Sequence, residues 1–315
     1  MFNPTDKSNP FNENSPAIDM NLLQQLISQQ AERHPLFENI AILGCGYVGT
    51  ALADHWQEQG HFVTGTTTSR EREFLLAEAI SKVVVMNGNN FQAVHSLLQG
   101  QNTLVVSVAP SGSQEANAAT YETTYLDTAK NLVLALSQNP QVKQVIYLSS
   151  CSVYGDRQGE WVNETTPIDP PEYKSQIIYE AEQIILQAAT DRQKVCVFRL
   201  GGIYGPDREL VRMFGGLAGM TMPGKGDRFV NWIHRDDIIG AIEFARSNGL
   251  DGIYNLVDDS QMRIKEQIER VCDRYNLPPA NWDTSKLSLQ QKSLQVNNQK
   301  LKAIGYDLIH PQLLV

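Results

Sequence analysis

The stretch Asn39–Trp56 reads NIAILGCGYVGTALADHW and decides the fold of this 315-residue chain. Its first five residues form an apolar run that predicts a short buried strand, and Val48, Leu52 and Trp56 recur at the spacing of one helix face. Between strand and helix, three glycines follow the pattern GxGxxG, which permits a tight turn, the approach of a pyrophosphate and close packing of helix on strand. Three glycines alone would also fit an ordinary turn. The strand before them and the helix after them favour a dinucleotide-binding loop at Gly44, Gly46, Tyr47, Val48 and Gly49.

The residues after the next expected strand, His61–Gly65, bear on which dinucleotide is bound. An NAD-selective site usually places Asp or Glu about 20 residues after the first glycine. Here the window Thr66–Arg70 holds hydroxyls and an arginine, and Glu71 is the first carboxylate. This composition suits the 2′-phosphate of NADP, with NAD as the alternative. The other interpretation of Arg70 is that it begins the next helix and points into solvent. The further cofactor contacts that we predict are Thr67, Thr68, Arg70 and Ala109.

The composition excludes several classes of protein. With a net charge of −9 and no basic stripe, the chain lacks the surface that a nucleic-acid partner needs. No run approaches the roughly 18 apolar residues of a membrane span, and the first residues lack the basic start and apolar stretch of a signal peptide. The four cysteines form no CxxC pair and the six histidines show no metal-ligand spacing. These features predict reduced thiols, no metal site and a soluble, cytoplasmic protein.

The N-terminal segment 1–38 differs from the rest of the chain. Residues 1–18 are rich in Asn, Pro and Ser, which predicts disorder, and Asp19 is suited to cap a short helix that ends near Arg33. A dinucleotide-binding fold has no place for this helix. It therefore either packs on the outside of the protein, which we favour, or mediates self-association into a homo-oligomer.

From residue 39 to residue 200, strand and helix patterns alternate. Short, continuous apolar runs are typical of parallel strands covered on both faces, and four of them follow at 83–86, 104–108, 145–148 and 195–198. The helical patterns between them are clearest over Ala118–Leu136 and Gln176–Ala189. This alternation predicts an α/β fold with a Rossmann-type, doubly wound parallel sheet over residues 39–200.

The composition of the sequence changes after residue 200. Glycine and proline cluster there, which predicts loops that build a smaller, loop-rich substrate lobe over most of 201–315. A late strand at 253–257 and a helix at 264–275 are expected to return to the core.

The segment Leu148–Asp156, LSSCSVYGD, resembles the short-chain dehydrogenase/reductase superfamily, specifically its extended, NAD-dependent epimerase/dehydratase branch. Arg199–Pro206 is similar to the strand-to-loop segment R-L-x-x-I-Y-G-P of that family, and Asn231–Ile238 to its I-H-x-x-D segment. Tyr254-Asn255 and Asn298–Tyr306 are similar to its late Y-N strand and its closing K-L…L-G-Y pattern. These motifs follow in the expected order and leave out little but the N-terminal extension, so they are far more specific than the glycine loop alone.

The resemblance implies a proton relay of serine, tyrosine and lysine. In the family, a tyrosine phenol exchanges a proton with the substrate hydroxyl, and a serine or threonine bonds the same substrate oxygen. A lysine four residues after the tyrosine lowers the phenol pKa and holds the nicotinamide ribose. By register, Ser150 takes the serine position, although a capping or loop serine is the other interpretation. Tyr173 is the expected tyrosine.

The chain departs from the family pattern at the lysine. If Tyr173 is the family tyrosine, Ile177 holds the lysine position, and if Glu182 sets the register, Lys174 and Ile178 replace the pair. None of the eleven tyrosines is followed by lysine at the fourth position. A free phenol has a pKa of about 10, so a tyrosine without a positioned cation is a poor base near neutral pH. Lys174 and Lys225 are the substitutes that the sequence offers from elsewhere.

Clustered cations in the second lobe suit a phosphorylated or carboxylated ligand, although ordinary surface arginines are the other interpretation. We assign Arg208 and Arg228 to the substrate, together with His234, which fits a structural hydrogen-bonding residue better than an acid–base catalyst. The motifs predict an NADP-preferring oxidoreductase or epimerase that acts on a small hydroxylated substrate, for example a nucleotide sugar. The alternative is a dinucleotide-sensing regulator or scaffold that kept the fold and lost the proton relay.

Overall fold

The computed structural model describes residues 37–110, 117–168, 170, 172–286 and 292–315. Residues 37–315 form one compact unit, and nearly all of the predicted N-terminal extension lies outside the described residues. Among the described residues, no helix is both long enough and apolar enough to cross a membrane.

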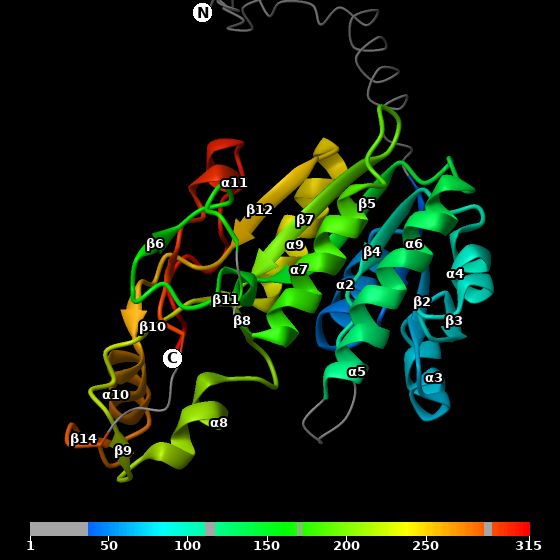
Figure 1. Ribbon diagram of the computed structural model, residues 1–315. Helices are drawn as coiled ribbons and strands as arrows, with labels where there is room; N and C mark the ends of the chain where they lie inside the picture. Colours follow the sequence, from blue (N-terminus) through cyan, green and yellow to red (C-terminus); the bar gives the residue numbers. More distant parts are fainter. Residues whose placement is uncertain (1–36, 111–116, 169, 171, 287–291) are drawn as a thin grey trace, which may run out of the picture. The chain divides into compact units, whose positions relative to one another are not determined.

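A seven-stranded sheet forms the centre of this unit (Figure 1). Its order is β3-β2-β1-β4-β5-β7-β12, and every neighbouring pair is parallel. The strands span Asn39–Leu43 (β1), Phe62–Thr67 (β2), Lys82–Val85 (β3), Thr103–Val106 (β4), Gln144–Ser150 (β5), Lys194–Leu200 (β7) and Gly252–Leu256 (β12). β2 and β4 lie on opposite sides of β1, and a ligand crevice is expected at the carboxyl ends of the strands at such a switch point. The predicted Rossmann-type fold is confirmed.

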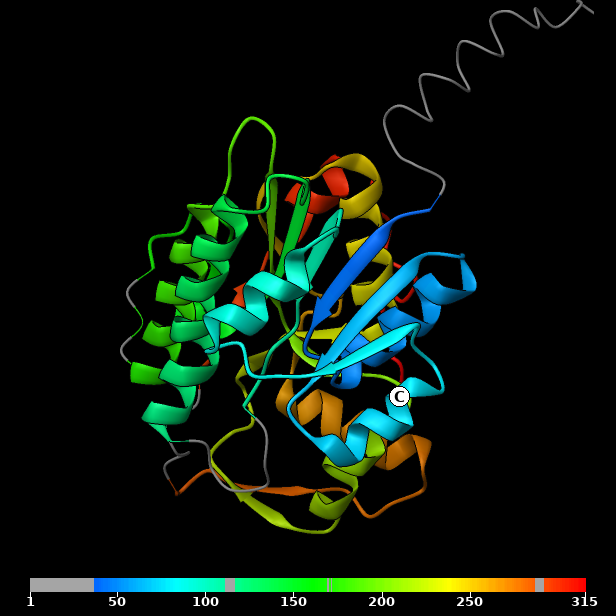
Figure 2. The same cartoon turned by 90° about the vertical axis from the view of Figure 1, so that its right-hand side faces the viewer.

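Helices cover both faces of the sheet (Figure 2). Ile40 and Ile42 of β1 pack with Leu52 and other residues of α2 and α9. Ala41 and Leu43, which alternate with them, pack against α4, α6 and α7. The helices span Tyr47–Glu58 (α2), Phe91–Leu98 (α4), Thr128–Ser137 (α6), Tyr173–Leu186 (α7) and Arg235–Asn248 (α9).

The helical run predicted over Ala118–Leu136 contains a π-helical segment. α5 (Ala118–Tyr121) passes into the π-helix η1 (Glu122–Asp127), which continues into α6. The hydrophobic period of the sequence does not reveal this change of pitch. Such segments are rare and are often found at functional sites.

The C-terminal lobe is built from short elements. Its small two-stranded sheets pair β8 (Gly202–Tyr204) with β11 (Trp232–His234), β9 (Thr221–Pro223) with β14 (Asn281–Asp283), and β10 (Phe229–Val230) with β13 (Met262–Arg263). β6 (Trp161–Val162) pairs with β15 (Gln295–Val296), and the helices are α8 (Leu210–Phe214), α10 (Ile264–Arg274) and α11 (Gln299–Ala303). β12 leaves this lobe and adds the edge strand beside β7.

A buried ion pair links the sheet to a helix beneath the carboxyl end of β5. The Arg199 guanidinium on β7 bonds both carboxylate oxygens of Glu182 on α7, and both side chains are almost completely buried. Arg199 also donates to the hydroxyl of Tyr154 (2.9 Å), which in turn donates to Asn255 (2.8 Å). The family-like motifs around Tyr154, Arg199 and Asn255 therefore meet in one hydrogen-bonded network.

Candidate functional site

The three loop glycines meet different surroundings. Gly44 has φ +102°, and a Cβ there would lie 2.6 Å from the carbonyl oxygen of Ser107. A Cβ on Gly49 would lie 2.3 Å from the carbonyl oxygen of Gly44, so helix and strand require a glycine where they touch. A Cβ on Gly46 would meet nothing within 4 Å. The loop therefore combines a tight turn, close packing and an open face, which are the three needs of a pyrophosphate loop.

A cavity of about 600 Å³ opens beside this loop. The ends of β1, β2 and β4 and the π-helical segment supply its walls, including Thr123 and Thr124 of η1. Among the described residues that line it, none carries a carboxylate, while Arg72 and Arg208 bring two cations. Six of the residues assigned to the cofactor from the sequence line this cavity: Gly44, Gly46, Tyr47, Thr67, Thr68 and Ala109. Val48 and Gly49 form the first turn of α2 behind them.

The arginine at this cavity is Arg72, and Arg70 does not line it. Ser69 caps α3 (Arg70–Ala77), and its hydroxyl accepts from the N–H of Arg72 (3.3 Å). Arg70 is thus the exposed first residue of the helix. This agrees with the interpretation that it begins the helix and points into solvent, and not with a role in cofactor binding. The Arg72 guanidinium reaches back to the carbonyl oxygen of Cys45 in the glycine loop (2.8 Å). Ser69, read as a capping residue, is the sequence signal that separates the two arginines.

Arg208, which the sequence assigned to the substrate, lines the cavity beside the glycine loop. Its guanidinium stacks over the ring of Tyr47 at 4.2 Å from the ring centroid. The Tyr47 hydroxyl donates to the carbonyl oxygen of Pro206 (2.7 Å), so the glycine loop and the segment after β8 are joined at this point.

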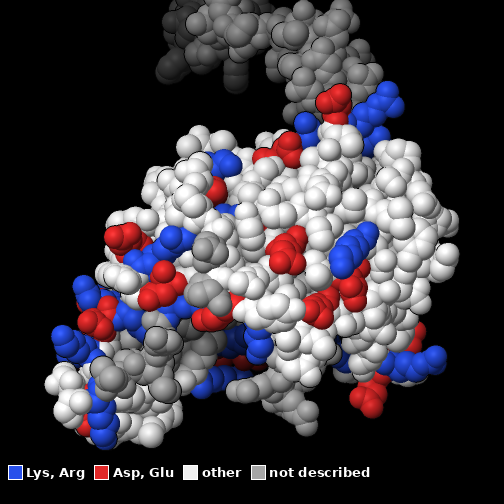
Figure 3. Space-filling model, viewed as in Figure 1, with Lys and Arg blue, Asp and Glu red and all other residues white. Residues whose placement is uncertain are grey.

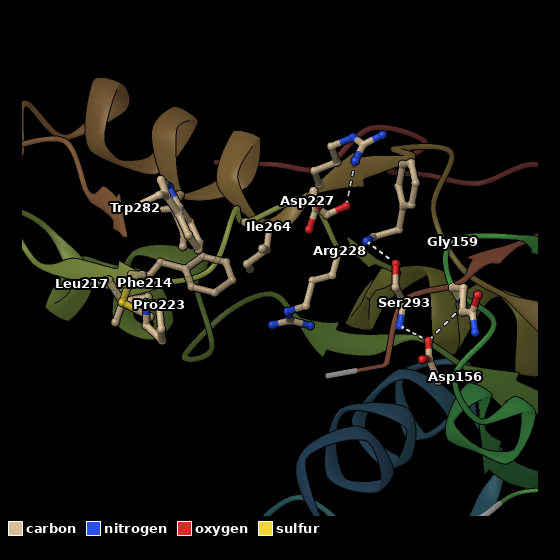
Figure 4. Close-up of a pocket in the computed structure, with 16 residues that line it drawn as sticks. Asp156, Gly159, Phe214, Leu217, Pro223, Asp227, Arg228, Ile264, Trp282 and Ser293 are labelled. Atoms are coloured by element: carbon tan, nitrogen blue, oxygen red, sulfur yellow. Dashed lines mark hydrogen bonds between the residues drawn. The ribbon is translucent and has the colours of Figure 1, made fainter. Parts of the chain in front are cut away.

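A second cavity, of about 840 Å³, lies in the C-terminal lobe (Figure 4). Phe214 and Trp282 line one side of it, and Asp156 and Ser293 line another. Arg228 extends between these two sides. Its Nε is buried without a hydrogen-bond partner among the described residues, and burial lowers the pKa of the guanidinium. Arg228 is half-buried and forms no ion pair with Asp156 or Asp227, which line the same cavity, so its guanidinium could bind an anionic ligand.

The surface in Figure 3 mixes acidic and basic side chains, and no broad basic area covers the part of this face that the structure describes. All four cysteines are free and buried.

Comparisons with known proteins bear on the identity of this arrangement. The model of the NAD dependent epimerase/dehydratase family matches residues 40–256. Protein YeeZ of Escherichia coli K12 is 30% identical over 289 residues, which are 88% of this chain and 98% of that protein. The chain belongs to the NAD-dependent epimerase/dehydratase family.

Solved structures share the fold of this family member. Human epimerase family protein SDR39U1, solved with NADPH, is 18% identical with a TM-score of 0.70, and the match covers 87% of this chain and 96% of that one. UDP-glucose 4-epimerase of Thermus thermophilus, solved with NAD, is also 18% identical with a TM-score of 0.70, covering 86% of this chain and 94% of that one.

The residues expected in the family's proton relay lie apart from these two cavities. Ser150 ends β5, and its hydroxyl accepts from the N–H of Ser152 (3.1 Å), as a capping serine does. Tyr173 begins α7, is 51% exposed and donates to the carboxylate of Glu122, a bond that raises the pKa of its phenol. Ile177 is 2% exposed, so a lysine placed there would bury its charge.

Lys292 is the lysine that the structure brings to this end of α7. Its Nζ donates to Ser175 Oγ (2.9 Å) and lies 3.0 Å from a carboxylate oxygen of Glu172. Of the substitutes that the sequence offered, Lys174 lies over the ring of Tyr121 at 5.2 Å and Lys225 is exposed. No local pattern points to Lys292, because 117 residues separate it from Ser175.

His234 lines neither cavity and caps α9. Its Nδ1 accepts from the N–H of Asp236 (3.2 Å), and its ring packs on that of His310 with centroids 4.0 Å apart. Burial and the neighbouring His310 lower the pKa of its imidazole. His234, Asp236 and His310 could together offer three ligand atoms to a metal. However, the cap occupies His234 Nδ1, and Arg235 lies 3.8 Å from the Asp236 carboxylate, so the local charges disfavour a cation.

Proposed function

We propose that this protein is an NADP-preferring oxidoreductase or epimerase that acts on a small hydroxylated substrate of the nucleotide-sugar type. The observation that carries the proposal is the cavity beside the glycine loop, which offers an open pyrophosphate face, threonine hydroxyls and Arg72, with no carboxylate among its described lining residues. A carboxylate there would bond a free ribose 2′-hydroxyl and repel a 2′-phosphate.

Arg72 is placed to select the phosphorylated dinucleotide. It extends from the first turn of α3, beyond the end of β2 where Thr67 and Thr68 line the cavity. Guanidinium and phosphate form strong, charge-assisted hydrogen bonds. SDR39U1 was solved with NADPH and the UDP-glucose 4-epimerase with NAD, so similar folds hold either dinucleotide and Arg72 is the feature of this chain that favours NADP.

Arg228 supports an anionic substrate in the second cavity. Its buried, unbonded Nε lies near the aromatic rings of Phe214 and Trp282, and a nucleotide sugar carries both a diphosphate and a flat base. The likeness to a UDP-glucose 4-epimerase agrees with this assignment.

The family register gives the proton step to Ser150 and Tyr173, although neither lines the two cavities described above. A bound nicotinamide would supply or accept the hydride. Ser150 has a lone pair engaged by the Ser152 N–H, which leaves its O–H free to donate to a substrate oxygen. The Tyr173 hydroxyl donates to Glu122, a bond that raises the phenol pKa. This phenol would have to leave Glu122 to reach a substrate, and it would suit the acid of a carbonyl reduction better than the base of an alcohol oxidation.

A fluorescence titration with NADPH and NADH tests the cofactor assignment. We expect wild type to bind NADPH at least several-fold more tightly than NADH. Arg72→Ala should lose that preference, with roughly a tenfold loss of NADPH affinity and little change for NADH. Arg70→Ala is the matched control and should behave as wild type. Equal affinities for both cofactors in wild type would refute the NADP preference.

The second candidate function is a dinucleotide sensor with little or no turnover. The exposed Tyr173 and the buried Ile177 favour it, because together they leave the family's tyrosine without its lysine. A screen of NADPH oxidation with 4-keto nucleotide sugars and of NADP+ reduction with 4-hydroxy nucleotide sugars separates the two. Turnover that Ser150→Ala and Tyr173→Phe abolish would support the enzyme, whereas tight NADPH binding without turnover on any substrate would support the sensor.

A further inference from the structure

We propose that Arg208 is a cofactor residue that closes over the pyrophosphate of the bound dinucleotide from the C-terminal lobe. The inference rests on the proposed function and extends it, since neither the glycine pattern nor the family motifs assign this arginine to the cofactor. It makes the cofactor site a joint product of the sheet domain and the lobe.

The first support is the place of the guanidinium. Arg208 lines the same cavity as Gly46, whose missing side chain leaves the loop face open. Tyr47 begins α2, a twelve-residue helix whose first N–H groups have no partners within the helix. The stacked guanidinium of Arg208, at 4.2 Å from the Tyr47 ring centroid, therefore stands beside the anion-binding end of that helix. A pyrophosphate at Gly46 would have backbone donors on one side and this cation on another.

The second support is that Arg208 is not engaged elsewhere. In the described part of the chain, no carboxylate forms an ion pair with its guanidinium. Glu209, the adjacent acid, pairs with Arg212 (2.8 Å) and accepts from the N–H of Asp207 (3.1 Å). The five N–H donors of the Arg208 guanidinium therefore remain available to a ligand.

The third support is that the chain holds Arg208 in place before any ligand arrives. Gly205 and Arg208 exchange backbone hydrogen bonds (3.4 and 2.9 Å) and close a tight turn. Asp207 within that turn has φ +66°, a left-handed conformation that costs free energy for a residue other than glycine. The Tyr47 hydroxyl fixes the turn by its bond to Pro206 (2.7 Å). A cation held in position loses little freedom on binding, which favours affinity.

This placement separates the tasks of the two cavity arginines. Arg72 lies toward the end of β2 and would meet the 2′-phosphate, which NADH lacks. Arg208 lies at the start of α2 and would meet the pyrophosphate, which NADPH and NADH share. Loss of Arg72 should therefore change the ratio of the two affinities, whereas loss of Arg208 should lower both and keep the ratio.

Binding titrations of the full chain with NADPH and with NADH test this division. Arg208→Gln should weaken both cofactors by about 10- to 100-fold, the range for one charge-assisted contact. Arg208→Lys should fall between wild type and Arg208→Gln, because lysine keeps the charge without the stacking fork. Tyr47→Phe keeps the ring but frees the turn, and should cost a few-fold. Arg212→Gln is the matched control and should bind both cofactors as wild type does.

Three outcomes would overturn the proposal. Unchanged affinity of a folded Arg208→Gln for both cofactors would do so, with the proposed function intact. A loss confined to NADPH would place the guanidinium at the 2′-phosphate instead. If wild type binds neither cofactor, the proposed function falls and this inference falls with it. A thermal melt of each variant establishes that it is folded, as expected because Arg208 is exposed.

Discussion

Gly46 and Gly49 belong to one loop, yet an added methyl group has different consequences at the two positions. At Gly46 the methyl group would enter open space, where the pyrophosphate is expected. At Gly49 it would lie 2.3 Å from a backbone carbonyl oxygen, which must then move. The first change should act on binding and the second on folding.

We therefore expect Gly46→Ala to melt as wild type does while NADPH affinity falls at least tenfold, because the methyl group takes pyrophosphate space. Gly49→Ala should lose about 1–3 kcal/mol of stability through overpacking. Differential scanning fluorimetry and NADPH titration of both variants measure this contrast. A Gly46→Ala variant that binds normally would reduce the glycine pattern to a structural turn.

Asp258 is a buried acid that the proposed chemistry does not use. One of its carboxylate oxygens is buried without a hydrogen-bond partner among the described residues, and burial raises its pKa to about 8. Because this folded-state pKa lies above the unfolded value of about 3.9, the stability that the group contributes is fully present below that value. It is lost as the pH rises through about 8.

Asp258→Asn should remove this dependence. The free energy of unfolding of the variant, relative to wild type, should rise between pH 5 and pH 8 by on the order of a few kcal/mol and level off above that. Urea unfolding across this range provides the measurement. Parallel curves for the two proteins would mean that Asp258 is ionised in the folded state at pH 5.

At the scale of single elements, the pair Arg199–Glu182 ties β7 to α7 inside the core, where neither charge reaches water. Glu182→Gln leaves the guanidinium without its counter-charge and should cost about 3–5 kcal/mol. Glu209→Gln breaks the exposed pair with Arg212 and should cost at most about 1 kcal/mol. Urea unfolding of both variants gives the comparison, and equal costs would contradict the structural role of the buried pair.

The elements also show what the sequence could and could not predict. The strands and the glycine loop follow from local patterns, since apolar runs and GxGxxG act over a few residues. The π-helical segment η1 keeps the hydrophobic period of its neighbours, so that pattern hides it. Arg70 and Arg72 differ by half a helical turn, and the helix start at Ser69 decides between them.

At the scale of the whole molecule, long-range contacts explain why the sequence misassigned Arg208 and missed Lys292. Arg208 and Lys292 reach their positions through contacts with residues more than a hundred positions away, Tyr47 and Ser175. A pattern read along the chain carries no information on such contacts, and the resemblance covered motifs but not the loops between them. The arrangement of the two cavities therefore could not be predicted from the sequence.

Residues 37–315 form one compact unit, so we expect this fragment to fold without the preceding segment. Its melting temperature and NADPH affinity should equal those of the full chain. At a free NADPH concentration of about 100 times its Kd, the cofactor should stabilise both proteins by about 2.7 kcal/mol. Light scattering on the pair also tests self-association, the alternative role of the predicted N-terminal helix, which would give an oligomer for the full chain and a monomer for the fragment.

The reactivity of Cys45 should report on opening of the glycine loop. Cys45 lines the cavity beside the glycine loop, but its side chain is only 2% exposed and its sulfur packs beside Gly65 in the core, where burial raises the thiol pKa to about 11. An alkylating reagent needs an accessible thiolate, so the rate of modification at Cys45 measures how often the loop opens. A bound dinucleotide that keeps the loop closed should slow the modification of Cys45. The modification rate of Cys196, which is buried in the sheet, should not change. Time-resolved mass spectrometry of the unmodified wild-type protein could thus follow cofactor occupancy without any engineered label.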